Sequence, residues 1–360
     1  MKPECIFLIP SLGGGGAEHV CVRIANAGVA LGRRISVVVV CKRDPFWSCL
    51  DDKIEVVDLR KGRVRWSPVA LVRSLRRFPG VPILAFSLEV AVIAVVARKL
   101  GLLDHPIYYR EPSRPSIVAQ QGWVANLYKL VLANVTGVIA QTDGALAELK
   151  ALHPCRGVTI PNPFGIEYAP GRHDPKAKPE GGPWLVSVGR LAPEKRHDWT
   201  IRGVVGCRDS WPGAHLSIAG EGPERPRLES LIAAVGAASS VSLHGFVAPI
   251  LPLLAASDVL VVASSHEGHP NVIVEALLSG CRALVVDAPG CRDVMCDLGL
   301  RECLVPEGDF VAQFATHLGR VLALPPEPFT LARHRIVEQF DPYRIARRYL
   351  EVCVGVEPLA

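Results

Sequence analysis

The stretch Glu267-Gly268-His269-Pro270-Asn271-Val272-Ile273-Val274-Glu275 places two carboxylates around the expected start of a helix at Pro270-Asn271. Asn271 and Glu275 are four apart and share a helix face, and a helix N-terminus offers N–H groups and a positive dipole end to an anion. A pair of acids alone is most often a solvated helix start. Here an apolar run over 256–263 precedes the two acids. It predicts a buried parallel strand that ends at the loop containing Glu267. Amides and carboxylates together suit the diphosphate and the hydroxyls of a nucleotide-sugar.

Apolar strands alternate with helical stretches along the whole chain, which predicts parallel sheets in an α/β architecture. The expected strands are 5–9, 35–41, 83–86, 106–109 and 137–141 in the first half, and 184–189, 216–219, 241–243, 259–263 and 283–286 in the second. A polar, Pro-rich stretch at 172–183 separates the two series and marks a boundary region.

The length of 360 residues favours two domains, because single cores stop growing near roughly 250–300 residues. We expect a first domain at 1–165, a second at 166–340, and a helical segment at 341–360 that packs back toward the first domain. Both domains should be doubly wound and Rossmann-like. Such sheets bind ligands beyond the carboxyl ends of their strands, so a central cleft between the two domains is expected.

Charge is distributed unevenly along the chain. Residues 1–165 hold 21 Lys and Arg against 12 Asp and Glu, a net +9, whereas the remainder carries −4. Arg73, Arg76 and Arg77 accompany an apolar stripe in an expected amphipathic helix. Such a segment can lie on an anionic membrane surface, and an ordinary helix with a solvated basic face explains it equally well. No helix-turn-helix or aromatic pattern accompanies the charge, so nucleic acid is not an expected partner.

Cysteine usage and hydropathy bear on the compartment. The eleven cysteines form no CxxC pair, and their number is odd. No apolar run reaches the roughly 20 residues of a membrane span, and no secretory signal is recognised. Free thiols in a reducing cytoplasm are therefore expected.

Glycines and cations follow several of the expected strands. The glycine run at 13–16 follows the first strand and opens a helix, where backbone can approach a phosphate closely. Its spacing is not G-x-G-x-x-G, and Cys41-Lys42-Arg43 stands where a ribose-binding acid would end the second strand, so a dinucleotide oxidoreductase is disfavoured. Arg190 and Lys195 follow the strand at 184–189 and suit a diphosphate that accumulates charge as its bond breaks. In isolation they would be an ordinary surface ion pair.

These motifs together resemble glycosyltransferase family 4, a family of retaining enzymes with the GT-B fold. The resemblance rests on Gly189-Arg190 with Lys195, Gly220-Glu221-Gly222-Pro223, His244-Gly245-Phe246 and the stretch from Glu267 to Glu275. It implies that Arg190 and Lys195 hold the donor diphosphate, that Glu267 contacts the transferred sugar and that Glu275 holds the ribose. It also implies further donor contacts at Gly15, Gly16, Gly189, Gly222, His269, Asn271, Val272 and Ile273. The sequence departs from the family at His269, which bears on sugar choice, and at Pro289-Gly290-Cys291.

If the second half binds the donor, strand-end residues of the first half are candidates for the acceptor. These are Glu18, Glu89, Arg110 and Glu111. Glu89 is also explained as a helix-start acid favoured by the dipole. Arg110 and Glu111 could form a local ion pair, and we favour contact with an anionic or hydroxyl-rich acceptor.

The resemblance implies a retaining hexosyltransferase that needs no cofactor. Its donor substrate is expected to be a nucleoside-diphosphate sugar, with a UDP-sugar as the first candidate. Because no Asp-x-Asp occurs in the chain, no metal is expected on the diphosphate. The segment from Ser11 to Glu18 looks like that of bacterial members that extend polyprenyl-diphosphate-linked saccharides in lipopolysaccharide or other envelope polysaccharide synthesis. With the basic first domain, this predicts a lipid-linked acceptor and peripheral attachment to the anionic cytoplasmic face of the inner membrane.

Two other functions remain open at this point. A nucleotide-sugar epimerase of the same fold breaks the same bond without an acceptor, and transfer to an added acceptor would distinguish the two. A catalytically silent partner subunit would retain only the fold. It would not need Arg190, Lys195, Glu267 and Glu275 together.

Overall fold

The computed structural model describes residues 2–13, 15–41, 46–120, 122–165, 181–357 and 359. The chain forms two compact units. Unit 1 comprises Met1–Ile166 and Gln339–Ala360, and unit 2 comprises Glu167–Glu338. The part of the predicted boundary region at 172–180, like Gly14, Lys42 and Arg43, lies outside the described residues.

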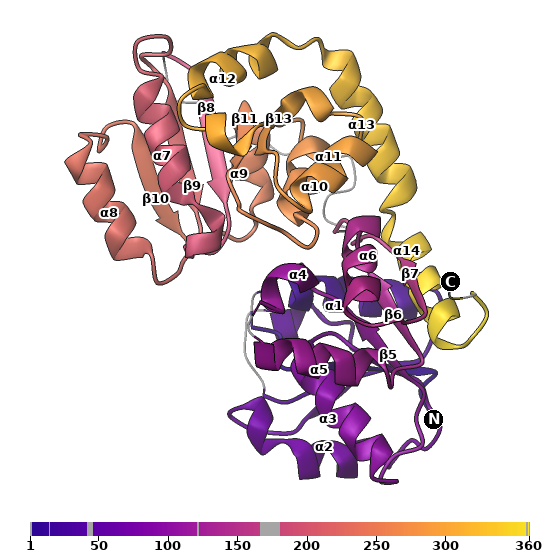
Figure 1. The fold of residues 1–360 in the computed structure, drawn as a ribbon. Coiled ribbons are helices and arrows are strands. Elements are labelled where there is room, and N and C mark those ends of the chain that lie inside the picture. Colours follow the sequence, from indigo (N-terminus) through magenta and orange to yellow (C-terminus); the bar gives the residue numbers. More distant parts are fainter. Residues whose placement is uncertain are drawn as a thin grey trace. The chain divides into compact units, whose positions relative to one another are not determined.

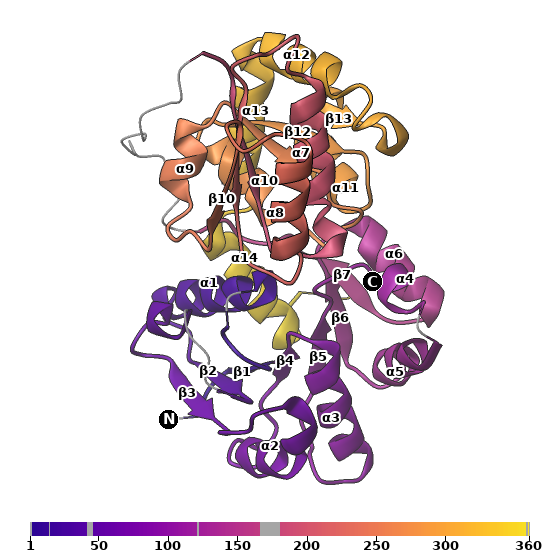
Figure 2. The ribbon, with the colours of Figure 1, turned by 90° about the vertical axis from the view of Figure 1, so that its left-hand side faces the viewer.

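Unit 1 is built on a sheet of seven parallel strands among the described residues, in the order β3-β2-β1-β4-β5-β6-β7. Figure 1 labels β5, β6 and β7 of this sheet, and Figure 2 labels all of its strands. The strands are β1 (Cys5–Ile9), β2 (Ile35–Val39), β3 (Glu55–Asp58), β4 (Ile83–Ala85), β5 (Ile107–Arg110), β6 (Gly137–Ala140) and β7 (Gly157–Thr159). The order reverses between β1 and β4, as in doubly wound folds. The segments that follow these two strands therefore flank the switch point of the sheet.

Helices cover both faces of the unit 1 sheet, and the alternation of β1 explains why both are apolar. Cys5, Phe7 and Ile9 pack in one core cluster, whereas Ile6 and Leu8 pack in the other. The first cluster includes α1 (Gly16–Ala30) and α14 (Pro342–Cys353), which lie side by side (Figure 2). The second includes residues of α2 (Pro68–Leu75), α3 (Leu88–Lys99), α5 (Gly122–Leu132) and α6 (Asp143–Leu152), and α4 (Pro115–Val118) packs against α6.

Unit 2 holds a second parallel sheet, with six strands in the order β10-β9-β8-β11-β12-β13 among the described residues. The strands are β8 (Trp184–Val188), β9 (His215–Ala219), β10 (Val241–Gly245), β11 (Val259–Val262), β12 (Arg282–Val286) and β13 (Leu304–Val305). The helices are α7 (His197–Gly206), α8 (Arg225–Ala234), α9 (Leu251–Ala256), α10 (Asn271–Leu278), α11 (Cys291–Asp297), α12 (Phe314–Ala323) and α13 (Pro326–Gln339). This order is the Rossmann order, with the reversal between β8 and β11.

The predicted architecture of two Rossmann-like α/β domains with a helical C-terminal segment is confirmed. Strands β3, β7 and β13 were not predicted. Strand β3 is half-exposed with charged ends, β7 and β13 have only three and two residues, and all three lie at the edges of their sheets. Arg110 is the last residue of β5 and not part of the following loop. Helix α13 ends at Gln339 and α14 begins at Pro342, after Asp341, whose carboxylate accepts from Arg344 N at 2.7 Å. None of the helices in the described ranges is long and apolar enough to span a bilayer.

Candidate functional site

The strands that flank the unit 2 switch point carry the predicted donor residues. The turn 189–195 follows β8 and the loop 264–270 follows β11, and these two strands are neighbours. Parallel strands present their carboxyl ends at one edge of the sheet, where ligands of such folds bind. Sequence segments about 70 residues apart are thereby brought together.

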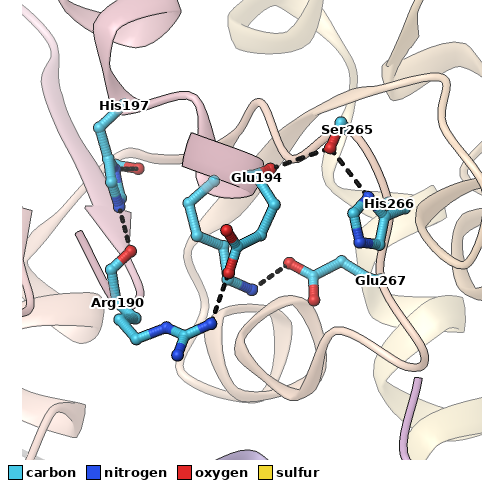
Figure 3. A network of polar contacts seen from close by, with 8 residues as sticks. Arg190, Glu194, His197, Ser265, His266 and Glu267 are labelled. Carbon is cyan, nitrogen blue, oxygen red and sulfur yellow. Dashed lines mark hydrogen bonds and ion pairs between the residues drawn. The ribbon is translucent and has the colours of Figure 1, made fainter. Parts of the chain in front are cut away.

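Direct bonds join the turn 189–195 to the loop 264–270. Ser265 N donates to Glu194 O at 2.8 Å, and Lys195 Nζ lies 2.5 Å from Glu267 Oε1 (Figure 3). The side chains of Lys195 and Glu267 are 24% and 16% exposed, so this ion pair is well shielded. The sequence analysis predicted that both residues contact the donor. The structure places their charged groups against each other.

Arg190 is also paired within the turn. Its Nη2 lies 2.6 Å from Glu194 Oε1, while its side chain is 69% exposed. Burial raises the pKa of Glu194, but hydrogen bonds from its own backbone N–H and from Arg190 outweigh this and lower the pKa overall. Glu194 is therefore a carboxylate anion at neutral pH. Arg190, Glu194, Lys195 and Glu267, which we call the four-charge cluster, sum to zero charge.

The buried side chain of His197 bonds to the backbone of the turn 189–195. His197 begins α7, with Nδ1 3.1 Å from Ser187 Oγ and Nε2 3.3 Å from Arg190 O. Because a carbonyl only accepts, Nε2 carries the proton, and Nδ1 accepts from the serine hydroxyl. Burial lowers the pKa of His197 to about 4, so the ring is neutral. It holds the backbone of Arg190 to β8 (Figure 3).

Helix α10 begins at Asn271, as the sequence predicted, with Pro270 as N-cap and no side-chain cap. Ile273 N donates to Pro270 O at 3.0 Å, so this backbone donor bonds within the protein, while Asn271 and Val272 lie in the same first turn. Glu275 and His269 are both buried, at 7% and 8% exposure. Together these residues form the predicted loop and helix start within unit 2.

Close backbone approaches fix the surrounding turns. A Cβ at Gly290, where φ is 80°, would lie 1.9 Å from Glu267 O, and Glu267 N donates to Pro289 O at 3.0 Å. The Pro289-Gly290-Cys291 departure noted in the sequence thus packs directly behind Glu267. Gly222 contacts the Leu191 backbone in the same way, at 2.3 Å from a built Cβ to the carbonyl oxygen. Gly189 precedes Arg190 and contacts the Lys195 side chain.

The glycine loop of unit 1 lies at that unit's own switch point. Gly15 is the N-cap of α1, Gly16 is its first residue, and Glu18 lies in the first turn. Burial raises the pKa of Glu18, although the backbone N–H groups of Glu18 and Gly15 and the charge of Arg110 favour its anion. The pKa of this carboxyl is raised overall, because burial outweighs these groups. Glu89 is exposed in the first turn of α3, which follows β4.

Arg110 and Glu111 are buried, at 1% and 0% exposure. Arg110 donates from Nη2 to Asn162 Oδ1 at 2.6 Å and from Nε to the Tyr349 hydroxyl at 3.3 Å. These bonds link β5 to α14 and to the segment that ends the first part of unit 1. Glu111 accepts from Ser113 N and Oγ and from the Tyr109 hydroxyl. Both head groups bond inside unit 1, and they do not pair with each other in these bonds. Contact with an acceptor stays a prediction for them.

Three residues that position the site were not predicted from the sequence. Glu194 and His197 bond to Arg190, and Ser265 bonds to Glu194. A signal existed for Glu194, which is four residues from Arg190 and opposite in charge. The bonds of Ser265 join the loop after β11 to the turn after β8, and those of His197 reach back across that turn to Ser187 and Arg190, so both become visible only in the fold.

Known proteins share both the fold and part of the sequence. Residues 182–323 match the family described as glycosyl transferases group 1. The lipopolysaccharide core biosynthesis glycosyltransferase LpsE of Rhizobium meliloti is 30% identical over 177 residues, which cover 48% of this chain and 50% of LpsE. A GDP-mannose-dependent alpha-mannosyltransferase of Mycobacterium tuberculosis is 28% identical, covering 59% of this chain and 56% of that protein. The chain thus spans about half the length of these relatives.

Solved structures match over nearly the whole chain. Anabaena HepE in complex with UDP and glucose superposes with a TM-score of 0.78 at 20% identity, covering 97% of this chain and 99% of HepE. WaaG, a glycosyltransferase involved in lipopolysaccharide biosynthesis, gives a TM-score of 0.77 at 18% identity. The match covers 98% of this chain and 100% of WaaG.

The two Rossmann-like units and these structural neighbours define the GT-B fold. Residues 182–323, which match the glycosyl transferases group 1 family, contain the whole four-charge cluster. The resemblance inferred from the motifs between Gly189 and Glu275 is confirmed at this level.

Proposed function

We propose that this protein is a retaining glycosyltransferase that moves a hexose or N-acetylhexosamine from a nucleoside-diphosphate sugar to a lipid-linked or cell-envelope saccharide. Unit 2 binds the donor, with UDP-sugars as the first candidates, and unit 1 binds the acceptor. Relatives and neighbours named for lipopolysaccharide synthesis and a neighbour bound to UDP and glucose support this choice.

The observation that carries the proposal is the pairing of Lys195 with Glu267 at the unit 2 switch point. A nucleotide-sugar presents a diphosphate and a ring of hydroxyls in one molecule. A cation for the former and a carboxylate for the latter lie side by side here, with Arg190 on the same turn. Charge-assisted bonds of this kind are about twice as strong as neutral ones.

The proposed lipid surface rests on unit 1. Trp66, just before α2, is 66% exposed, and Val69, in the first turn of α2, is 83% exposed. The arginines around them, Arg63, Arg65, Arg73, Arg76 and Arg77, are exposed as well, and with Trp66 and Val69 they form what we call the basic α2 surface. Arg76 Nε donates to Leu102 O at 2.9 Å, which places the exposed Leu100–Leu102 segment beside it. Exposed aromatic and aliphatic side chains among cations suit an anionic lipid interface.

A screen of nucleotide-sugars by thermal shift tests the donor assignment. A ligand at 100 times its dissociation constant adds about 2.7 kcal/mol of stability. The stabilising donor is then incubated with a polyprenyl-diphosphate-linked saccharide and, separately, without acceptor. Transfer only in the first reaction supports the proposal, whereas epimerised donor in the second identifies an epimerase. Binding without either reaction identifies a silent partner subunit.

Metal independence is part of the proposal, and its basis is the absence of Asp-x-Asp together with Arg190 and Lys195 at the donor site. We expect transfer to proceed at the same rate in excess EDTA. Loss of activity in EDTA that returns with a divalent cation would show that the diphosphate is neutralised differently.

A further inference from the structure

The four-charge cluster contains one carboxylate, that of Glu194, to which no role has been given. It follows Arg190 by four residues and lies 2.6 Å from the guanidinium. Glu267 has a role toward the sugar, but Glu194 lies on the same turn as the two cations. A negative group at that point opposes the binding of a diphosphate to Arg190.

Glu194 is held in place more firmly than its partner. Its carbonyl accepts from Ser265 N at 2.8 Å and from Ser265 Oγ at 3.3 Å, which fixes the backbone to the loop 264–270. The carboxylate also bonds to its own backbone N–H and is 28% exposed, against 69% for Arg190. The guanidinium can therefore turn toward a ligand while the carboxylate stays in the turn.

From this asymmetry we infer that Glu194 is a positioning residue that limits the affinity of the site for nucleoside diphosphates and thereby favours release of the nucleotide product. The inference rests on the proposed function. An exposed ion pair is worth little to stability, so Arg190 leaves it readily when a diphosphate binds. The remaining carboxylate then repels the bound phosphates and restores the pair when they depart.

The test is the affinity of UDP and of GDP for the wild-type protein and for Glu194→Gln, measured by titration calorimetry at low and physiological salt. The variant should bind the cognate diphosphate roughly five- to tenfold more tightly, the scale of one partly screened charge at short range. Its affinity should also fall more steeply with salt, because the site gains net positive charge. A residue with a merely structural role would give weaker binding when removed.

Turnover supplies an independent readout. In Glu194→Gln we expect a lower KM for the donor, a lower inhibition constant for the nucleoside diphosphate, and no gain in kcat. Glu229→Gln is the matched control, since Glu229 also pairs with an arginine four residues away, Arg225, at 2.9 Å and lies on α8. That variant should leave both affinity and turnover unchanged.

Glu194→Asp covers the case in which the glutamine variant does not fold. The shorter carboxylate keeps its charge but moves away from Arg190, so the affinity should lie between those of wild type and the glutamine variant. Equal or weaker binding by the folded variants overturns the inference and leaves the proposed function intact. If wild type binds neither diphosphate, the proposed function fails and this inference fails with it.

Discussion

Single charged groups lie at the carboxyl ends of β8 and β11, where we propose that unit 2 binds the donor. Arg190 is exposed and loosely paired, whereas Lys195 and Glu267 form a shielded pair. At the proposed donor site, a diphosphate would meet one exposed cation, Arg190, and one cation, Lys195, that must exchange its partner. This difference predicts unequal effects of removing each group.

We expect Arg190→Ala and Lys195→Ala each to lower kcat by roughly 10²–10³-fold, the effect of losing one charge-stabilising group. Lys195→Ala should also lower stability, since it leaves the shielded Glu267 carboxylate without this partner. Steady-state kinetics and urea unfolding measure the two effects. Activity within a few-fold of wild type in both folded variants would remove these cations from the mechanism.

Glu267→Gln should slow transfer and leave the protein without an attached sugar. The resemblance to family 4 places this residue beside the sugar hydroxyls and not beneath the anomeric carbon, so it should not act as a nucleophile. Intact-protein mass spectrometry during turnover checks this. A mass increase of one sugar in the wild type that is absent from the variant would instead identify Glu267 as the nucleophile.

At the scale of elements, the site depends on links between segments that are distant in sequence. His197 connects the start of α7 to β8 through Ser187 and to the turn through the Arg190 carbonyl. Helix α2 presents exposed arginines with exposed Trp66 and Val69 beside them. His197 and the basic α2 surface each lead to a separate prediction.

His197 should make stability depend on pH. Its pKa is about 4 in the folded protein, because the ring is buried, against the ordinary histidine value of 6.5, so the unfolded chain binds more protons between these pH values. Stability is therefore fully present above about pH 6.5 and is lost as the pH falls toward 4. Between pH 7 and pH 5 the loss amounts to about 2 kcal/mol for this group.

Urea unfolding of wild type and His197→Gln at pH 7 and pH 5 measures that contribution. The difference in unfolding free energy between the two pH values should be smaller in the variant by this amount. His334→Gln, which changes an exposed histidine of α13, is the control and should match wild type. An unchanged pH dependence in His197→Gln would show that the ring is charged in the folded protein.

The basic α2 surface should attach the protein to vesicles that contain anionic lipid. Salt should release it, because exposed charges are screened over about 8 Å at physiological ionic strength. Reversal of Arg73, Arg76 and Arg77 to glutamate should abolish sedimentation with the vesicles. The same reversal of Arg202, Arg320 and Arg333 in unit 2 serves as a charge-matched control. If wild type ignores such vesicles at low salt, the lipid-linked acceptor loses its physical support.

At the scale of the whole molecule, the chain forms two Rossmann-like units, and its C-terminal segment from Gln339 onward belongs to unit 1. Helix α14 follows α13 but packs on α1 of unit 1. Arg110 bonds to Tyr349 of that helix and to Asn162, near the end of the first part of unit 1. The interior of unit 1 thus depends on both ends of the chain.

The stereochemistry of the product is a property of the complete enzyme. A retaining enzyme uses either one face of the sugar for both departing and arriving groups or two displacements through a carboxylate. We expect same-face attack and an α-linked product from an α-linked donor, read from the anomeric signals by NMR. A β linkage would contradict the proposed retaining mechanism.

Much of this protein could be predicted from residue order alone. Strand and helix periods are local properties, so the two α/β series and the start of α10 at Asn271 follow from sequence. The motifs between Gly189 and Glu275 were sufficient to indicate the family, because glycines and charges at strand ends lie at the same edge of a parallel sheet.

Only the tertiary structure decided which charges meet. Lys195 and Glu267 are 72 residues apart, and their pairing depends on β8 and β11 being neighbours, which strand periodicity does not specify. Burial likewise decided that Arg110 and Glu111 bond within unit 1, since the same letters would serve a surface site equally well. Sequence fixes the chemistry that each side chain carries, whereas sheet order and packing determine its distance from the next one and its access to water.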